Sequence, residues 1–317
     1  MKIVILDRKT LTNDDISFAE IEALGDVVSY SSTPNELIVE RICDADVVLC
    51  NKSPITKEVI SACKNLKYIG LFATGYNNID IKAASERGIV VSNAGEYSTM
   101  AVAQHVFALI LEHYSKVSGY SSSVKNGDWE RSDTFSYFLS PTYEILGQTI
   151  GIIGFGSIGK AVAKVADAFG MKVIISTRTL PPKGLFPYEF VSRDEVFARA
   201  DILTLHCPLT ELTAGLINAE NLAKMKKTAL LINTSRGGTI IEQELADALN
   251  SGVIAGAGID VLTNEPMKNS PLKTAKSCVI TPHIAWSPRQ TRERLITIVA
   301  KNLGAFISGK PINVVNK

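Results

Sequence analysis

The sequence predicts an α/β protein with two doubly wound parallel sheets, each covered by helices on both faces. Short β-branched runs alternate with helical patterns, and this alternation favours parallel strands joined by crossover helices. A second series of the same kind starts at Thr149. The chain has 317 residues, which is enough for one large domain or two medium ones.

The first series contains short strands and short helices. Strands are expected over Lys2–Leu6, Val27–Tyr30, Val47–Cys50, Tyr68–Leu71 and Ile89–Val91, and helices over Asn35–Cys43 and Pro54–Ala62. A long helical pattern then covers Thr99–Tyr114, and Ser115–Pro141 is typical of a helix followed by a long loop.

The second series has the same character. Its expected strands are Thr149–Ile153, Lys172–Ser176, Ile202–His206, Ala229–Asn233, Gly256–Val261 and Val279–Ile280. The last helix is expected over Arg289–Ser308, and we expect it to pack near the first series.

Composition and charge exclude several classes of partner. The 33 Lys and Arg residues nearly balance the 32 Asp and Glu residues, giving a formal charge of +1. A near-neutral chain without a basic run lacks the electrostatic footprint of a protein that binds nucleic acid or an anionic membrane. The apolar run at the N-terminus is too short for a signal peptide, and no apolar stretch reaches the ~18 residues of a membrane span. We therefore expect a cytoplasmic protein.

The cysteines indicate neither a disulfide framework nor a metal centre. They are odd in number and lack C-x-x-C spacing, so we expect buried free thiols in a reducing compartment. The four histidines cluster neither with the cysteines nor with one another, so no metal site is expected. The cysteines are Cys43, Cys50, Cys63, Cys207 and Cys278, and the histidines are His105, His113, His206 and His283.

A glycine-rich loop between a strand and a helix predicts a dinucleotide site. In Gly154-Phe155-Gly156-Ser157-Ile158-Gly159, Gly154 allows the tight turn, Gly156 lets the backbone approach a pyrophosphate, and Gly159 lets the helix press on the strand. The free N–H groups and dipole of the following helix favour an anion. A glycine turn without a ligand is the alternative, and the strand before and the helix after the loop disfavour it.

The residues that would bind the ribose favour NADP(H). In an NAD site, an acid about 20 residues after the glycine loop accepts the ribose hydroxyl. Here no acid occurs between Met171 and Tyr188, and the position carries Thr177, Arg178 and Thr179. An arginine suits a 2′-phosphate, which a carboxylate would repel. The alternative is that Arg178 stacks on the adenine while NAD(H) binds through other hydroxyls.

Three charged residues stand at the ends of later strands. They are Arg236 in Asn-Thr-Ser-Arg-Gly-Gly, Glu265 before Pro266, and His283 after Pro282. In an open parallel sheet the residues just after the strands face the ligand crevice, so these three side chains are able to converge. Each one alone also has a purely structural interpretation.

Taken in order, the motifs resemble the D-isomer-specific 2-hydroxyacid dehydrogenase family over nearly the whole chain. The resemblance includes the glycine loop, Arg236-Gly237, Glu265-Pro266, Pro282-His283, the segments 74–80, 97–99 and 102–105, and His206-Cys207-Pro208-Leu209. It implies a flavodoxin-like substrate domain made of residues 1–99 and 287–317, with a Rossmann dinucleotide-binding domain of residues 100–286 inserted in it. It also implies a homodimer, with the Thr99–Tyr114 helix as a hinge and dimer element.

The resemblance further implies the roles of individual residues. Arg236 would hold the carboxylate and ketone oxygen of a 2-oxoacid, and His283 would donate a proton to the carbonyl oxygen as hydride arrives from the nicotinamide. Glu265 would hydrogen-bond His283 and favour its imidazolium form, with Asp260 acting from further away. His206, Cys207, Pro208, Thr234 and Asp260 would line the cofactor site, and Asn51, Thr74, Gly75 and Trp286 would bind substrate.

Aromatic residues favour a small substrate. Trp286 and the segment from Asp128 to Tyr137 resemble the glycerate dehydrogenase, or hydroxypyruvate and glyoxylate reductase, branch of the family. Large aromatics beside a pocket exclude bulk, although Trp129, Phe135 and Tyr137 are equally interpretable as core or dimer contacts. Other 2-oxoacids, such as those of D-lactate or phosphoglycerate dehydrogenases, remain alternatives, as does a dinucleotide-sensing co-repressor that binds without turnover.

Overall fold

The computed structural model describes residues 1–316, which divide into two units. One consists of Met1–Ser98 and the described residues from Trp286 onward, and the other of Thr99–Ala285. The expected boundaries placed Thr99 in the first unit and Trp286 in the second, and the structure has the reverse. Thr99 begins helix α5 (Thr99–Ser115) of the second unit, whereas the ring of Trp286 packs edge-on against Tyr97 of the first, with centroids 6.4 Å apart.

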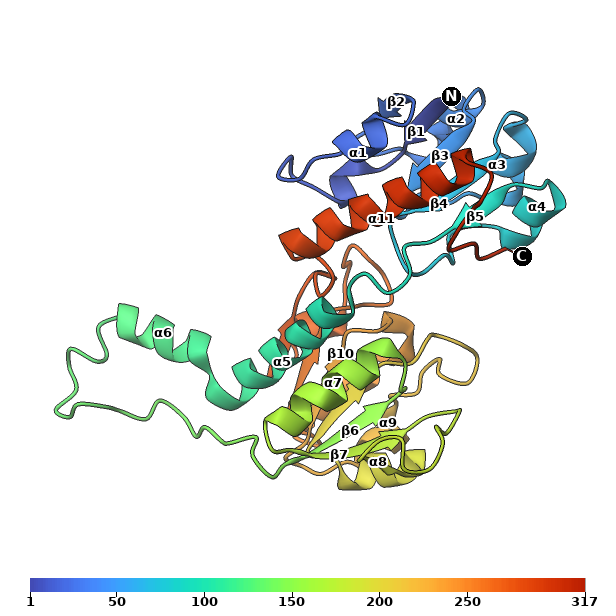
Figure 1. Ribbon diagram of the computed structural model, residues 1–317. Helices are drawn as coiled ribbons and strands as arrows, with labels where there is room; N and C mark the ends of the chain where they lie inside the picture. The colour runs from blue at the N-terminus through green and yellow to red at the C-terminus, as the bar shows by residue number, and fades with distance from the viewer. Residues whose placement is uncertain (317) are drawn as a thin grey trace. The chain divides into compact units, whose positions relative to one another are not determined.

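The first unit is built on a five-stranded parallel sheet in the order β2-β1-β3-β4-β5 (Figure 1). Its strands are β1 (Lys2–Ile5), β2 (Asp26–Ser29), β3 (Val47–Cys50), β4 (Tyr68–Leu71) and β5 (Val90–Ser92). Its helices are α1 (Ala19–Glu22), α2 (Ile38–Ile42), α3 (Lys57–Ala62), α4 (Ile81–Glu86) and α11 (Arg289–Ile307), with 3₁₀ turns at Arg8–Thr10 and Asn35–Leu37.

Alternate residues of each strand serve two cores. In β1, Ile3 and Ile5 join the cluster beneath α1 and α11, whereas Val4 joins the cluster beneath α2, α3 and α4. Successive side chains of a strand point to opposite faces, so a strand buried on both faces reads as a continuous apolar run. The final helix thus completes one of the two cores, because Leu295 and Leu303 of α11 are fully buried there.

The second unit has a seven-stranded sheet in the order β12-β11-β10-β9-β6-β7-β8, with every neighbouring pair parallel. The strands are β6 (Thr149–Ile153), β7 (Lys172–Ser176), β8 (Glu189–Phe190), β9 (Ile202–Leu205), β10 (Leu230–Asn233), β11 (Gly256–Ile259) and β12 (Cys278–Ile280). Helices α5 (Thr99–Ser115) and α7 (Ser157–Ala168) cover one face, and α8 (Arg193–Arg199), α9 (Ala219–Ala223) and α10 (Glu242–Ser251) cover the other. Further 3₁₀ turns lie at Gly237–Thr239 and Pro271–Thr274. The predicted class of two doubly wound parallel sheets is confirmed.

Helix α3 begins later than the sequence pattern indicates. The expected helix started at Pro54, but α3 starts at Lys57 because the hydroxyl of Thr56 accepts from the Val59 N–H and caps it. Similarly, the helix expected over 35–43 opens as a 3₁₀ turn and becomes α-helical only at Ile38.

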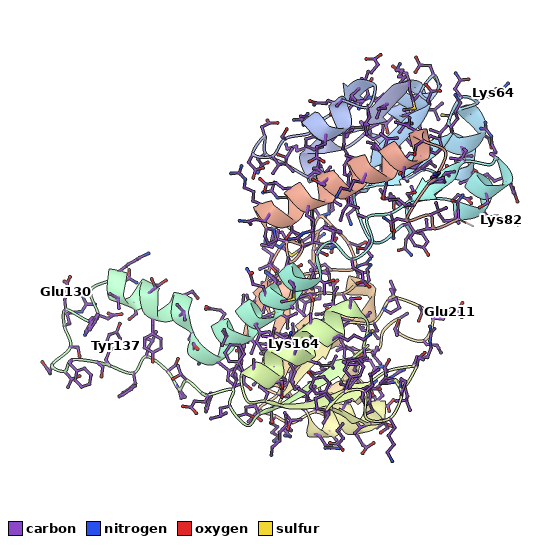
Figure 2. All side chains as sticks on the ribbon, viewed as in Figure 1. Lys64, Lys82, Glu130, Tyr137, Lys164 and Glu211 are labelled. Carbon is purple, nitrogen blue, oxygen red and sulfur yellow. The ribbon has the colours of Figure 1, made fainter. Side chains whose placement is uncertain are left out.

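An extended arm, residues 117–144, projects from the body of the second unit. It contains α6 (Val117–Lys125) and the loop after it, and both stand clear of the sheet in Figure 1. Internal hydrogen bonds fix the loop: Tyr137 donates to Ser123 Oγ at 2.9 Å, and the Trp129 indole donates to the Phe135 carbonyl at 3.0 Å. Figure 2 shows Glu130 and Tyr137 on this arm.

The arm corrects the interpretation of its aromatics as lining the pocket of their own chain. The arm leaves from the C-terminal end of α5, a helix about 25 Å long, so Trp129 and Phe135 do not lie beside the carboxyl ends of the strands, where the glycine loop is.

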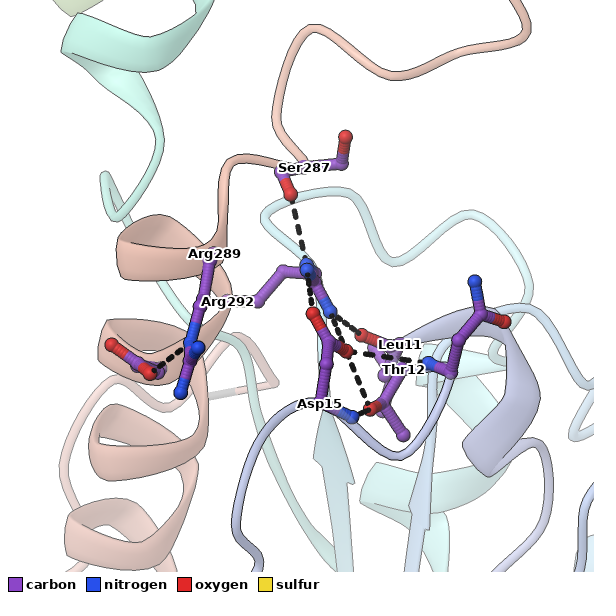
Figure 3. Close-up of polar contacts among 8 residues, drawn as sticks. Leu11, Thr12, Asp15, Ser287, Arg289 and Arg292 are labelled. Atoms are coloured by element: carbon purple, nitrogen blue, oxygen red, sulfur yellow. Dashed lines mark hydrogen bonds and ion pairs between the residues drawn. The ribbon is translucent and has the colours of Figure 1, made fainter.

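The chain is anchored where it returns to the first unit. Figure 3 shows Arg292 of α11 binding the Ser287 carbonyl at 2.8 Å, the Leu11 carbonyl at 3.1 Å, and both Asp15 oxygens at 2.7 and 2.6 Å. The Arg292 guanidinium holds the pKa of the Asp15 carboxyl well below its usual range. This fork fixes the entry to α11 against the loop after β1.

The expectation of five buried thiols is wrong for Cys43, which is exposed because it follows the last turn of α2 on the solvent side. Cys50, Cys63 and Cys207 are buried and Cys278 is partly buried. Burial raises the pKa of Cys63 to about 11 and that of Cys278 to about 12.

Two absences concern residues 1–316 alone. Within that range no group of three His, Cys, Asp or Glu side chains is placed to hold a metal ion. Likewise, none of the helices described there has the length and apolar character needed to cross a bilayer.

Candidate active site

The strand order of the second unit reverses between β6 and β9, and the glycine loop lies there. A reversal of this kind opens a crevice at the carboxyl ends of the strands. Gly154 follows β6 with φ +99°, and a Cβ on it would lie 2.5 Å from the carbonyl oxygen of His206, which follows β9. A Cβ on Gly159 would in turn collide with the Gly154 carbonyl. The loop therefore keeps its shape only with glycine at these two positions.

The residues around this loop fit a dinucleotide. Gly156 is the N-cap of α7, and nothing lies within 4 Å of where its Cβ would be, so backbone is open to an approaching group. Ser157 and Ile158 form the first turn of α7, whose N–H groups favour a phosphate. At the end of β10, the Thr234 hydroxyl is buried and has no hydrogen-bond partner among residues 1–316. A buried polar atom of this kind is costly unless a ligand satisfies it.

The residues expected at the ribose end follow β7. Arg178 and Thr179 are exposed and Thr177 is half-buried. Arg178 makes no hydrogen bond or ion pair with any other residue of the described part of the chain. Its guanidinium is therefore available to an anionic ligand.

His206, Cys207 and Pro208 continue from β9 beside the glycine loop. The His206 amide donates to the Ile153 carbonyl at 2.8 Å, and Nε2 of its ring lies 2.9 Å from Thr204 Oγ1. His206 is only partly exposed, and burial lowers its pKa to about 3. The ring is therefore neutral at physiological pH.

Glu265 and His283 are in direct contact, although they are 18 positions apart in the sequence. Nδ1 of His283 lies 2.7 Å from Glu265 Oε2, while Oε1 of the same carboxylate accepts from the Leu262 amide at 3.0 Å. A carboxylate accepts, so Nδ1 carries the proton and the far nitrogen, Nε2, remains for a ligand. The pair has the form of an acid–base group oriented by a carboxylate.

Asp260 holds the backbone that carries His283. Its carboxylate is almost completely buried and accepts from the amides of Ile284 and Ala285, both at 2.9 Å, and from Thr281 Oγ1 at 2.5 Å. The His283 amide donates to the Asp260 carbonyl at 2.8 Å. The expected distant influence of Asp260 on the pair therefore takes the form of a scaffold for the loop after β12.

Arg236 stands at the end of β10 with its side chain exposed. One terminal nitrogen donates to the Ser235 carbonyl at 2.7 Å, and no carboxylate of the described chain pairs with its guanidinium. Gly237 fixes its backbone, because a Cβ there would collide with the backbone of Leu262 and Thr263. The 236–238 turn and the turn that carries Glu265 are thus pressed together.

In the first unit the strand order reverses between β1 and β3, and Asn51 lies there. The Asn51 amide donates to buried Asp7 at 2.9 Å, and its side-chain amide donates to Thr10 Oγ1 at 3.0 Å. The amides of Lys52 and Ser53 also donate to Asp7, at 2.7 and 2.9 Å. Asp7 was missed from the sequence, although an acid directly after a buried strand is a usable signal.

Thr74 and Gly75 follow β4 in the same unit. The Thr74 carbonyl accepts from the side-chain amide of Asn93 at 2.7 Å, and its hydroxyl donates to the Gly95 carbonyl. Trp286 is half-buried against the core beneath α11. It thus has a packing role within this unit, whatever else it contacts.

Comparison with known proteins identifies the family. A sequence model described as the NAD-binding domain of D-isomer-specific 2-hydroxyacid dehydrogenases matches residues 107–285. The chain belongs to the D-isomer-specific 2-hydroxyacid dehydrogenase family. It is therefore an NAD(P)-dependent oxidoreductase that interconverts 2-oxoacids and D-2-hydroxy acids.

Similar family members include two curated enzymes and a solved structure. The hydroxypyruvate reductase of Blautia hydrogenotrophica is 44% identical, with 100% of each chain covered. The glycerate dehydrogenase of Methylorubrum extorquens is 39% identical over 99% of this chain and 98% of its own. An NADPH-dependent glyoxylate/hydroxypyruvate reductase from Sinorhizobium meliloti, solved with NADP and malonate, is 28% identical with a TM-score of 0.85, covering 99% of this chain and 96% of its own.

The neutral ring of His206 predicts acid sensitivity of this dehydrogenase. The ordinary pKa of 6.5 applies to the unfolded chain and about 3 to the folded one, so only the unfolded state takes up a proton as the pH falls from 6.5 to 3. We expect the free energy of unfolding to fall on acidification, with His206 contributing ~1–2 kcal/mol of the loss between pH 7 and pH 5. Urea unfolding of the wild type and His206→Gln at both pH values measures it. An equal decrease in the free energy of unfolding of the two proteins between pH 7 and pH 5 would contradict the low pKa of His206.

Proposed function

We propose that this dehydrogenase reduces a small 2-oxoacid, hydroxypyruvate or glyoxylate, to the D-2-hydroxy acid with NADPH. The observation that carries the proposal is the 2.7 Å contact between His283 and Glu265. The same unit contains the glycine loop and the buried Thr234 hydroxyl, which has no hydrogen-bond partner in the part of the chain that the structure describes. The names of the Blautia and Sinorhizobium relatives support the substrate class.

The protein residues divide the chemistry between binding and proton transfer. The cofactor supplies a hydride from its nicotinamide ring. In the form that acts as the acid, both ring nitrogens of His283 carry a proton: Nδ1 donates to Glu265, and Nε2 delivers its proton to the carbonyl oxygen of the substrate, which leaves the ring neutral. Arg236 offers planar paired donors to the substrate carboxylate and ketone oxygen, which suits its lack of a carboxylate partner in residues 1–316.

Residues of the first unit contribute to substrate binding in this proposal. We assign backbone groups of Thr74 and Gly75, together with Asn51, to the substrate carboxylate, and the indole of Trp286 to the limit on substrate size. The position of Asn51 at the reversal of strand order supports its assignment.

Five residues of the second unit complete the proposed cofactor site. His206, Cys207 and Pro208 continue from β9 beside the glycine loop, so we assign them to the wall of the cofactor site. Thr234 and Asp260 follow β10 and β11 and would line its nicotinamide end.

NADP(H) is the proposed cofactor because Arg178 is exposed and without a partner in the described chain, and no acid stands beside it. Thr177 and Thr179 flank it and supply hydroxyls suited to a phosphate. The NADPH dependence of the Sinorhizobium reductase shows that this cofactor occurs among similar structures. NAD(H) is the alternative.

A homodimer is proposed because the arm exposes large apolar side chains. Phe135 is 91% exposed and Phe138 is 90% exposed. A hollow of about 650 Å³ at the base of the arm is lined by Tyr143, Leu146 and Phe169, among others. Exposed apolar surface on this scale marks an interaction site, and a second copy supplies both an arm and a hollow.

The free thiols suit the reducing cytoplasm, where we place the protein.

Turnover tests the proposed activity. Absorbance at the nicotinamide band should fall when NADPH is mixed with hydroxypyruvate or glyoxylate and enzyme. His283→Ala should lower kcat by about 10²–10⁴, because it removes the proton donor, and Glu265→Gln should lower it less, while the Kd for NADPH changes only slightly in both. Failure of every small 2-oxoacid to oxidise NADPH or NADH would refute the enzyme assignment and favour a binding protein.

Arg178 decides the cofactor. Arg178→Ala should raise KM for NADPH about 10- to 100-fold, because a charge-assisted contact to the 2′-phosphate is lost, and leave KM for NADH nearly unchanged. Arg289→Gln, on an exposed arginine of the first unit, is the control. Equal efficiency of the wild type with both cofactors, or a preference for NADH, would overturn the inference.

Sedimentation tests the oligomeric state. We expect the wild type to sediment at micromolar concentration with the mass of two chains, and the Phe135→Asp/Phe138→Asp variant with that of one, because two charges replace apolar contact area. Leu212→Asp, at an exposed leucine off the arm, should remain dimeric. A monomeric wild type would rule out the arm as a self-association surface.

A further inference from the structure

Helix α5 reaches the loop that carries His283 through the side chain of His105. Nε2 of His105, in the second turn of α5, lies 2.9 Å from Thr281 Oγ1, and Thr281 Oγ1 donates to Asp260 Oδ1 at 2.5 Å. The same Nε2 atom is 3.5 Å from Asp260 Oδ1. These three side chains, called the relay below, join residues that are up to 176 positions apart in sequence.

The direction of the hydrogen bonds in the relay follows from proton counting. A threonine hydroxyl carries one proton, and Thr281 gives it to the Asp260 carboxylate, which also accepts two backbone amides. Thr281 Oγ1 therefore has only acceptor capacity left for His105. Nε2 of His105 must carry the proton and donate it.

The loop at the far end of the relay needs external support. His283 has φ +55°, a conformation that costs a non-glycine residue free energy and persists only where neighbouring contacts enforce it. Its own amide is bound by the carbonyls of Asp260 and Thr281. Thr281, two residues before His283, is the loop residue that His105 contacts directly.

The near end of the relay is firmly fixed. Leu109, one turn after His105, packs on β11, where a Cβ added to Gly258 would lie 2.9 Å from the Leu109 Cβ. Leu109 and Val106 are both buried in the core between α5 and the sheet. Because α5 is packed tightly on the sheet, the hydrogen bond from His105 holds Thr281 of the loop in a fixed position.

We propose that His105 is a positioning residue for proton transfer, holding the loop through Thr281 and Asp260 so that His283 keeps its orientation. This inference rests on the proposed reductase activity. The two ends of the relay also lie near the two ends of the second unit: the chain enters this unit at Thr99, where α5 starts, and leaves it after Ala285, whose amide binds Asp260.

Steady-state kinetics with NADPH and hydroxypyruvate tests the role. His105→Leu should lower kcat at least tenfold with KM for NADPH changed less than twofold, because the glycine loop is untouched. His105→Gln should keep at least half of the wild-type kcat, since the glutamine side-chain amide is able to donate to Thr281 Oγ1 from a similar position. In a Thr281→Val background, His105→Leu should cause little further loss, because the relay is already broken. Gln104→Leu, at the exposed neighbour of His105, should behave as wild type.

Amide hydrogen exchange separates this inference from the proposed function. The Ile284 and Ala285 amides should exchange at least tenfold faster in His105→Leu and in Thr281→Val than in the wild type or Gln104→Leu. An inactive wild type with this exchange pattern would refute the reductase activity and leave the relay standing. Three results would each overturn the positioning role. They are a His105→Leu variant with the kcat and amide exchange rates of the wild type, losses of kcat that add in the double variant, and a His105→Gln variant with a kcat as low as that of His105→Leu. If His105→Leu fails to fold, Thr281→Val and His105→Gln decide the same question.

Discussion

The buried carboxylate of Asp260 is the group on which the geometry of the candidate active site depends. A charge taken out of water is costly unless donors surround it, and Asp260 has three, from Thr281, Ile284 and Ala285. Those donors come from the one loop that carries His283. The hydrogen bonds that stabilise the carboxylate are therefore the ones that hold the loop in its conformation. Removal of Asp260 would leave three donors without an acceptor.

The first unit contains a counterpart built in the same way. Asp7 follows β1 and collects the amides of residues 51–53 after the neighbouring strand β3, just as Asp260 follows β11 and collects amides after its neighbour β12. In both cases an acid one or two residues after a buried strand joins two adjacent strand ends. Parallel strands end at the same edge, so one carboxylate is able to organise two loops there.

Local sequence pattern was sufficient for the glycine loop and for every strand except the two-residue β8 (Glu189–Phe190), because period and turn chemistry act over a few residues and β8 is too short to show a period. It was insufficient for contacts made by the folded sheet. Nothing in residue type pairs Thr281 with His105. The convergence of Glu265 and His283 was suggested only by the order of strand ends and by the resemblance to a known family. The aromatics of the arm were ambiguous for a physical reason: core, pocket and interface use the same side chains, and only exposure distinguishes Phe135 from a buried phenylalanine. Trp286 shows the same ambiguity, because its ring packs on Tyr97.

The inserted position of the second unit also has a consequence for biosynthesis. One core of the first unit contains Ile3 and Ile5 from the start of the chain and Leu295 and Leu303 from α11. The second unit is continuous in sequence, so during translation it emerges complete while the core of the first unit still lacks α11. The nascent first unit must therefore keep an apolar sheet face uncovered until α11 leaves the ribosome, and this interval is when the chain is most exposed to aggregation and to chaperones.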